Sequence, residues 1–312
     1  MDIALNIFYM LCGIAALYYG ADYLVKGGVE IAVRFKISSL VIGLTLVAFA
    51  TSAPELAVSM SSAFSGNPDI ALGNVIGSNI ANIGLILGIC ACILPLNVNR
   101  QLLKFDTPVM ILAAILMAVV YFCTGEISRL WGIIFFILLI AYLVRSVYVS
   151  RKENMNEKEE EIPSSYPLWL AIIIVIASLL LLVFGAKIFL AGTVYFAKLF
   201  KISDAVIGLT IVAVGTSLPE LATSIVATCK GEKDIAIGNV VGSNIFNTLG
   251  IIGLTSAVKP IRNTTINYVD FSTMSLLSIM LLIFMFSGKK LNRIEGASIL
   301  LIYIAYTVYL CM

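Results

Sequence analysis

Two glutamates, Glu55 and Glu220, stand in the middle of apolar stretches, in the related segments TSAPE and TSLPE. A charged side chain at the centre of a membrane-spanning helix costs roughly 2.5–3.5 kcal/mol even on lenient insertion scales, so two such residues indicate a functional site. Carboxylates are hard oxygen donors that suit Ca²⁺, and they suit Na⁺ or protons less selectively. Because two carboxylates neutralise one divalent cation, the pair predicts a buried cation site.

Further oxygen atoms lie on the same predicted helical faces as the glutamates. Positions i, i+3, i+4 and i+7 of these faces are Ala48, Thr51, Ser52 and Glu55 in one segment and Ala213, Thr216, Ser217 and Glu220 in the other. Pro54 and Pro219 lack a backbone N–H, so each helix is expected to kink and to free carbonyl groups. A Ser/Thr stripe alone is typical of helix–helix hydrogen bonding, but beside a buried glutamate and a proline it favours an ion site.

A second motif reads GNVIGSNIAN in one copy and GNVVGSNIFN in the other. It adds polar side chains at i, i+4 spacing, namely Ser78 with Asn82 and Ser243 with Asn247. It also places small residues four apart, Gly73 with Gly77 and Gly238 with Gly242, a spacing that lets helices approach closely. For the remaining asparagines two interpretations stay open, ion ligand or packing hydrogen bond: Asn74, Asn79, Asn239 and Asn244.

The rest of the chain supplies apolar helices to hold these motifs. Of its 312 residues 60% are hydrophobic and only 12% are charged, and the mean hydropathy is +1.04, far outside the range of soluble domains. We expect an all-α polytopic membrane protein in a lipid bilayer, with no nucleic acid as a partner. Ten apolar spans are predicted, near 4–26, 38–63, 69–94, 106–124, 130–149, 167–192, 203–228, 234–258, 268–287 and 294–311.

The two halves of the sequence repeat each other. The segment FKISSLVIGLTLVAFATSAPELAVS begins at Phe35, and FKISDAVIGLTIVAVGTSLPELATS begins at Phe200, an offset of 165 residues. We predict a first five-helix repeat at 1–150, a polar linker at 151–166 and a second repeat at 167–312. Five is an odd number, so the second repeat enters the membrane from the opposite side and is inverted.

The orientation follows from the basic residues. Most of the 20 Lys and Arg residues fall on the side of the membrane that carries the linker, which begins at Arg151. Positively charged loops stay in the cytoplasm, so the linker is expected there and both termini outside the cell, with the cell membrane as the location.

Taken together, the paired TSAPE and TSLPE segments, each followed by GNVxGSN, resemble the alpha repeats of the sodium/calcium exchanger family within the cation/calcium antiporter superfamily. The similarity covers about 70 residues in each repeat. It implies a secondary antiporter that exchanges Na⁺ for Ca²⁺ by alternating access, with three Na⁺ for each Ca²⁺ and hence net charge movement. No resident cofactor is expected, since both ions are substrates.

The resemblance also assigns roles to residues. Glu55 and Glu220 would be the central Ca²⁺ ligands, helped by Thr51 and Thr216. Flanking Na⁺ sites would use the backbone carbonyls of Ala48 and Ala213 and the hydroxyls of Ser52, Ser217, Ser78 and Ser243. Asn82 and Asn247 would line the centre. The first helix of each half, near 4–26 and 167–192, would move.

Other readings of the sequence remain. A proton-coupled or other divalent-cation antiporter would use the same glutamates, but the proton-coupled branch has a glutamate where this chain has Gly77 and Gly242. An intramembrane enzyme is disfavoured because the chain has no histidine and no plausible nucleophile beside a base. A passive channel fits the repeat with sequestered acids less well than exchange does.

Overall fold

The chain folds into helices that surround two central ones. The computed structural model describes residues 3–156, 167–201, 213–262, 266 and 268–311. The helices before residue 157 are α1 (Ile3–Phe35), α2 (Ser39–Ile42), α3 (Ala48–Thr51), α4 (Ala53–Phe64), α5 (Pro68–Ala81), α6 (Gly88–Ile93), α7 (Thr107–Thr124) and α8 (Arg129–Asn156). Those after it are α9 (Leu168–Leu199), α11 (Ala213–Thr216), α12 (Leu218–Cys229), α13 (Lys233–Ile245), α14 (Ile252–Val258), α15 (Tyr268–Gly288) and α16 (Arg293–Cys311).

Short π-helical turns join several of these helices into longer rods. They are η1 (Gly43–Val47), η2 (Asn82–Leu87), η3 (Leu102–Asp106) and η5 (Phe246–Ile251). The turn η2 joins α5 to α6, and η5 joins α13 to α14, which gives the two central rods. A π-turn inserts one extra residue per turn and is frequent at functional sites. Both central turns contain a predicted site asparagine, Asn82 in η2 and Asn247 in η5.

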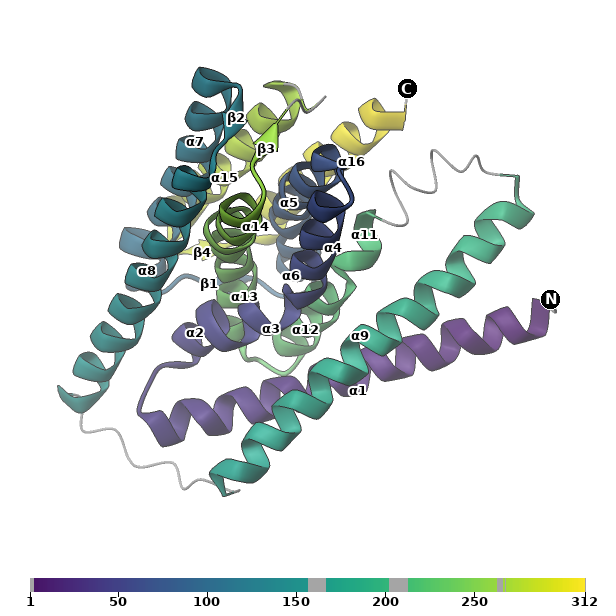
Figure 1. Cartoon of the computed structure of the whole chain (residues 1–312). Helices are drawn as coiled ribbons and strands as arrows, with labels where there is room; N and C mark the ends of the chain where they lie inside the picture. The colour runs from purple at the N-terminus through teal and green to yellow at the C-terminus, as the bar shows by residue number, and fades with distance from the viewer. Residues whose placement is uncertain (1–2, 157–166, 202–212, 263–265, 267, 312) are drawn as a thin grey trace.

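The central rods form the core of the molecule (Figure 1). In the most apolar window of the rod α13–η5–α14 every residue is buried, and in that of α5–η2–α6 72% are. Helices α7, α8, α15 and α16 pack around them and leave large apolar side chains such as Leu112 and Leu301 exposed. An outward apolar surface of this kind is what a bilayer requires, so the prediction of an all-helical membrane protein is confirmed.

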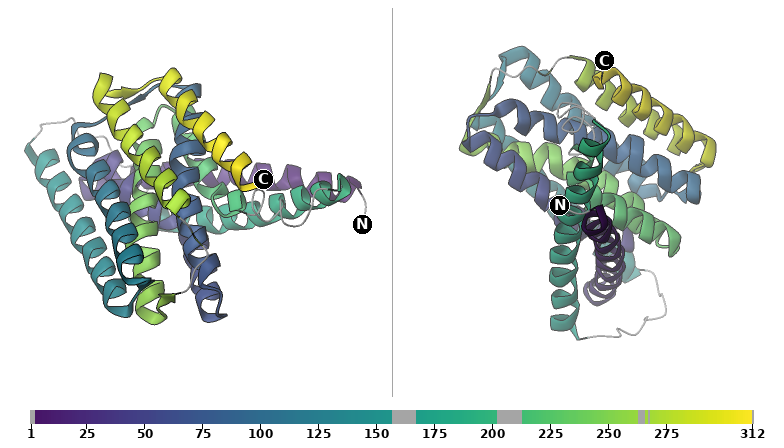
Figure 2. Two further views of the ribbon diagram at one scale, coloured as in Figure 1. Left: turned by 90° about the horizontal axis from the view of Figure 1, so that it is seen from above. Right: turned by 90° about the vertical axis from the view of Figure 1, so that its right-hand side faces the viewer.

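Helices α1 and α9 form a separate outer pair that crosses one side of the core (Figures 1 and 2). They run antiparallel, since Gly13 contacts Phe189 while Gly27 contacts Val175. Glycines face the partner backbone along the whole contact, and a Cβ atom on Gly20 would come within 2.9 Å of Leu182. The glycines therefore let two long helices approach closely.

Two short antiparallel strand pairs tie the halves of the chain together. Strand β1 (Leu96–Asn97) pairs with β4 (Lys290–Leu291), and β2 (Glu126–Ile127) pairs with β3 (Ile261–Arg262). An ion pair between Arg262 and Glu126 accompanies the second pair. Each pair joins one strand from either half, so the two halves interlock rather than fold as independent domains.

The helices that carry the glutamates are broken, as the prolines predict. Between the segments 39–51 and 53–64 the axis bends by 45°. Ser52 leaves helical geometry there, with φ −83° and ψ 5°, and Ser217 does the same between α11 and α12, with φ −87° and ψ 8°. Pro54 and Pro219 lie in the first turn of the helix that follows each break.

Several helices differ in extent from the predicted spans. The described residues contain eight helices long and apolar enough to cross a membrane, and nine if the bent pair around Ser52 counts as one. Most of the first half of the span expected near 203–228 lies outside the described residues, so the number ten stays a prediction. Helices α1 and α9 continue to Phe35 and Leu199, well past the expected ends at 26 and 192.

The described part of the expected linker is helical. Its first six residues, 151–156, continue α8 as a helix to Asn156, while 157–166 lie outside the described residues. Arg, Lys, Glu and Met are good helix formers, so a helix leaving an apolar environment continues through them although they are polar. Charge marks where a segment meets water, and it does not by itself end a helix.

Candidate functional site

The two glutamates lie at the centre of the fold, each bound to a serine from the opposite half. Glu55 is 0% exposed and Glu220 is 1% exposed. Ser52 donates to Glu220 Oε1 at 3.0 Å, and Ser217 donates to Glu55 Oε1 at 3.2 Å. Since each serine precedes its own glutamate by three residues, this exchange of bonds brings both helix breaks to one centre.

The helix breaks also orient partial charges toward this centre. Glu55 and Glu220 lie in the first turns of α4 and α12, where the positive end of the helix dipole stabilises a carboxylate. The preceding segments end at Thr51 and Thr216, where carbonyl groups give a partial negative charge. A cation between the breaks would therefore meet negative groups from both halves.

Two asparagines on neighbouring helices form hydrogen bonds to the helices that carry the glutamates. Asn74 donates to the Glu55 carbonyl at 3.2 Å and to Ser59 Oγ at 3.0 Å. Asn239 donates to the Glu220 carbonyl at 3.5 Å and to Ser224 Oγ at 3.0 Å. The sequence left these asparagines open between ligand and packing residue, and the geometry of both amide groups favours packing.

Thr51 extends this support across the halves. Its hydroxyl is fully buried and lies 3.1 Å from Asn239 Oδ1 and 3.4 Å from the Ala48 carbonyl oxygen. Ser59 and Ser224 were not singled out from the sequence. Each stands four residues after a glutamate, so the i, i+4 rule that selected Ser52 and Ser217 could also have found them.

The remaining polar groups form a hydrogen-bonded cluster between the central rods. Asn82 donates to Asn244 Oδ1 at 2.9 Å, and Asn247 donates to Asn79 Oδ1 at 3.1 Å. Asn79 in turn donates to Thr248 Oγ1 at 3.0 Å. The amide nitrogens of Asn82 and Asn247 thus bind protein, which leaves their oxygens as the groups able to face an ion.

Five buried oxygen atoms around this centre have no hydrogen-bond partner within the described part of the chain. They are Glu55 Oε2, Glu220 Oε2, Asn82 Oδ1, Asn247 Oδ1 and Ser243 Oγ. Buried polar atoms are almost always paired, because an unpaired one costs about 1–3 kcal/mol. Four of the five can only accept, and a set of converging acceptors is what a cation requires.

The predicted site residues are placed as follows. Most of them are buried, namely Ala48, Thr51, Ser52, Ser78, Asn82, Ser243, Asn247 and both glutamates. The Ser78 hydroxyl lies 3.4 Å from Ser217 Oγ. Thr216 is half-buried at the end of α11. Ala213 begins α11, but its side chain lies outside the described residues. No group of three or more Cys, Asp or Glu residues that could hold a metal occurs within the described ranges.

The close approach predicted for the paired glycines is seen at Gly238 and Gly242, whose contact segment is described. A Cβ on Gly238 would lie 2.8 Å from the Leu40 carbonyl oxygen, and one on Gly242 would lie 2.8 Å from the Ala48 Cβ. These glycines therefore allow α13 to press against the segment that leads to the first helix break. A Cβ on Gly73 would lie 3.6 Å from Ile266 Cδ1, and one on Gly77 would meet no described atom within 4 Å, so the role of this first pair stays a prediction.

Comparison with known proteins connects this geometry to a family. The family model described as sodium/calcium exchanger protein matches residues 5–148 and 170–312. The sodium/calcium exchanger MaX1 of Methanosarcina acetivorans is 34% identical over 348 aligned positions, covering 99% of both chains. The inner membrane protein YrbG of Escherichia coli is 34% identical over 278 positions, covering 86% of this chain and 85% of the relative.

A solved structure agrees with these matches. The sodium-calcium exchanger NCX_Mj, soaked with 10 mM Na⁺ and zero Ca²⁺, superposes with a TM-score of 0.85 at 34% identity, covering 98% of this chain and 99% of that one. Family model, relative and structure thus confirm the resemblance that the two repeated motifs suggested. The chain belongs to the sodium/calcium exchanger family, a family of membrane transporters and not of enzymes.

Proposed function

We propose that this chain is an electrogenic antiporter that exchanges Na⁺ for Ca²⁺ across the cell membrane. The observation that carries the proposal is the set of buried oxygens around Glu55 and Glu220 that have no hydrogen-bond partner among the described residues. Two carboxylates this deeply buried repel each other unless a cation or protons offset their charge. One Ca²⁺ offsets both charges and accepts six to eight oxygen ligands.

The same oxygens serve the two ions at different times. Glu55 and Glu220, with Thr51 and Thr216, bind Ca²⁺ at the centre. Na⁺ ions bind at flanking positions, formed by the carbonyls of Ala48 and Ala213 and the hydroxyls of Ser52, Ser217, Ser78 and Ser243. Asn82 and Asn247 line the space between these flanking positions. Because both ion sets need the glutamates, binding of one excludes the other, which is the condition for exchange.

The proposed architecture has ten membrane spans in two inverted five-helix repeats, at 1–150 and 167–312. Its support is the antiparallel course of α1 and α9, which occupy equivalent places in the repeats, and the strand pairs that join the halves. Residues 151–166 lie in the cytoplasm and both termini outside, as the basic residues indicate. Access alternates when the α1–α9 pair moves across the core.

Calcium uptake into proteoliposomes tests the function. We expect an outward Na⁺ gradient to drive ⁴⁵Ca²⁺ uptake, and K⁺ or proton gradients of equal size to drive none. Uptake driven by a pH gradient without Na⁺ would contradict Na⁺ coupling and favour the proton-coupled alternative.

Voltage tests the stoichiometry. With three Na⁺ leaving for each Ca²⁺ that enters, one positive charge leaves the vesicle per cycle, so an interior-positive potential accelerates uptake. A potential of 100 mV biases one charge by roughly 2.3 kcal/mol. Equal uptake at interior-positive and interior-negative potentials would contradict an electrogenic cycle.

A further inference from the structure

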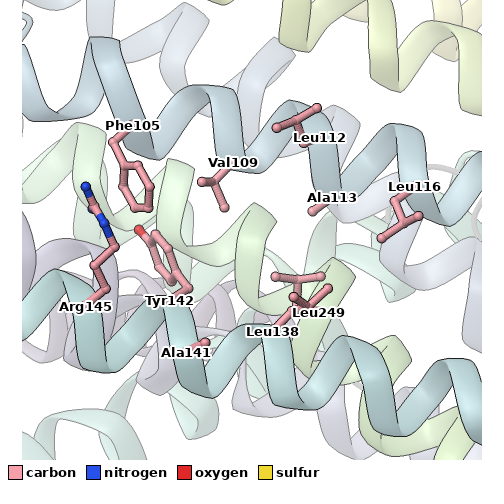
Figure 3. A pocket seen from close by; sticks show the side chains of 10 residues that line it. All are labelled: Phe105, Val109, Leu112, Ala113, Leu116, Leu138, Ala141, Tyr142, Arg145 and Leu249. Atoms are coloured by element: carbon pink, nitrogen blue, oxygen red, sulfur yellow. The ribbon is translucent and has the colours of Figure 1, made fainter.

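A groove lies between α7 and α8, whose side chains line it from both sides (Figure 3), and neither glutamate is among its lining residues. It encloses about 310 Å³. Its lining is apolar except for one end, and consists of Phe105, Val109, Leu112, Ala113, Leu116, Leu138, Ala141, Tyr142, Arg145 and Leu249. Leu112 and Leu138 at its rim are 64% and 41% exposed, so the groove opens toward the surrounding lipid.

The charged end of the groove is formed by Arg145, whose guanidinium lies over the ring of Phe105. Within the described residues no hydrogen bond or ion pair engages this exposed guanidinium. Tyr142 beside it donates its hydroxyl to the buried Asp106 at 3.1 Å, so this hydroxyl proton is already used inside the protein. Arg145 therefore retains its donors for a group outside the protein.

Further positive charge surrounds this end. Lys104 directly precedes Phe105, and Arg151 and Lys152 follow Arg145 about 10 Å farther along α8, at 1.5 Å per residue. The nearest carboxylates on these segments are the fully buried Asp106 and the exposed Glu153. Basic pockets between membrane helices attract anionic lipid headgroups.

The length of the groove matches one leaflet of a bilayer. From Phe105 to Leu116 the helix rises about 16 Å, close to half of the roughly 30 Å hydrocarbon core. A chain that fills the groove would thus end near the bilayer midplane, with its headgroup at Arg145. The volume is at the small end of ligand pockets, about 300–1,000 Å³, which suits one acyl chain better than a whole lipid.

The equivalent helices of the second half differ from α7 and α8 at two positions of this groove. The Asp106–Tyr142 bond recurs there as a 2.7 Å bond from Tyr306 to Asp270, an offset of 164 residues. At that offset Arg145 corresponds to Tyr309, and Ala113 corresponds to the larger, fully buried Leu277. The groove thus depends on one small residue and one arginine that the repeat does not share.

We propose that the α7–α8 groove binds one anionic phospholipid, with an acyl chain along Val109, Ala113 and Leu116 and the phosphate at Arg145. The site does not depend on the ion chemistry at the glutamates. It makes the chain sensitive to the headgroup composition of the leaflet that faces Arg145.

Native mass spectrometry of the full chain, released from bilayers of phosphatidylcholine with a minority of phosphatidylglycerol, tests the proposal. We expect the wild type to retain phosphatidylglycerol above its share of the bilayer. Arg145→Gln should lower the retained phosphatidylglycerol about fivefold, the effect expected of one basic residue near an anionic lipid, and Arg145→Lys should restore most of it. Lys152→Gln, which removes a charge at the same end but outside the groove, should lower the retained phosphatidylglycerol by less than Arg145→Gln does.

The apolar part of the groove needs its own variants. Ala113→Leu should reduce retention of both lipids by filling the groove. If this buried substitution impairs folding, Ala141→Leu at the exposed rim of the groove repeats the test. Ala305→Leu, on the exposed surface of α16, is the matched control. Retention of the two lipids in proportion to their supply would overturn the proposal. So would an Arg145→Gln variant that retains as much phosphatidylglycerol as the wild type.

Discussion

The centre of this molecule and its rim differ in how well the two halves match. Around the glutamates nearly each contact occurs twice, as the reciprocal serine bonds of Ser52 and Ser217 show at 3.0 and 3.2 Å. At the rim the halves diverge, since Asp22 of α1 forms an ion pair with Lys230, whereas the equivalent residues are Lys187 and Ser65. Under the proposed function the central groups bind one shared ion and must match, while groups that face lipid or water need not.

The match at the centre is not complete. Asn79 donates to Thr248, but the residue equivalent to Thr248 in the first half is Ile83, so this bond has no counterpart. Ser78 lies within hydrogen-bond distance of Ser217, whereas the Ser243 hydroxyl has no partner among the described residues. The two equivalent serines, Ser78 and Ser243, therefore have different surroundings.

The strongest test of the symmetric centre removes one glutamate charge at a time. We expect Glu55→Gln and Glu220→Gln each to reduce Na⁺-driven Ca²⁺ uptake by about 100-fold or more, since breaking a buried set of opposite charges costs about 3–5 kcal/mol. Initial rates in proteoliposomes measure the effect. Full uptake by either variant would show that the two glutamates do not share one ion.

A smaller effect is expected from the serines that cross between the halves. Ser52→Ala and Ser217→Ala each remove a hydrogen bond to a carboxylate, an interaction worth about 1.5–3 kcal/mol, so Ca²⁺ affinity should fall at least about tenfold in both. Isothermal titration with Ca²⁺ measures this change. Ser61→Ala, on the exposed face of α4, should bind as the wild type does, and unequal losses in the two site variants would break the proposed equivalence.

Symmetry also extends to the close contacts of α8 and α16 with the central rods. A Cβ on Gly132 would lie 2.7 Å from the Gly253 carbonyl oxygen, and one on Gly296 would lie 2.6 Å from the Ala91 Cβ. Overpacking of this kind costs about 1–3 kcal/mol, so Gly132→Ala and Gly296→Ala should both lower the thermal unfolding midpoint. Gly288→Ala meets nothing closer than 3.7 Å and serves as the control. A midpoint unchanged in both variants would contradict the close packing.

The smallest expected effect concerns the asymmetric rim. Lys230→Gln removes the ion pair between α12 and α1, but Asp22 keeps Lys26 at 2.9 Å. Because the Lys230 side chain is 34% exposed, we expect a loss of unfolding free energy of no more than about 1 kcal/mol. The unfolding midpoint at low and high salt measures it, with Lys187→Gln as the control. A loss as large as that of Gly132→Ala would mean that the rim holds the halves together as firmly as the core.

Much of this protein could be predicted from local sequence. The apolar runs predict membrane helices because every backbone group in a bilayer must be bonded within a helix. The repeated segments predict equivalent places for Glu55 and Glu220, and Pro54 and Pro219 predict the breaks, since each proline removes one backbone donor. These properties depend on residues near in sequence, so the residue types suffice.

Tertiary structure alone decided which groups meet. No spacing rule indicates that Ser52 binds Glu220 instead of Glu55, because the two residues lie on different helices. Nor does one indicate that Asn74 and Asn239 donate to backbone carbonyls, while the side-chain oxygens of Asn82 and Asn247 have no partner in the described part of the chain. The continuation of α8 to Asn156 and the groove at Arg145 were also not visible in the sequence. The length of a helix depends on how far its neighbours pack against it. A groove depends on the sizes of side chains that face each other from two helices, so neither feature follows from composition.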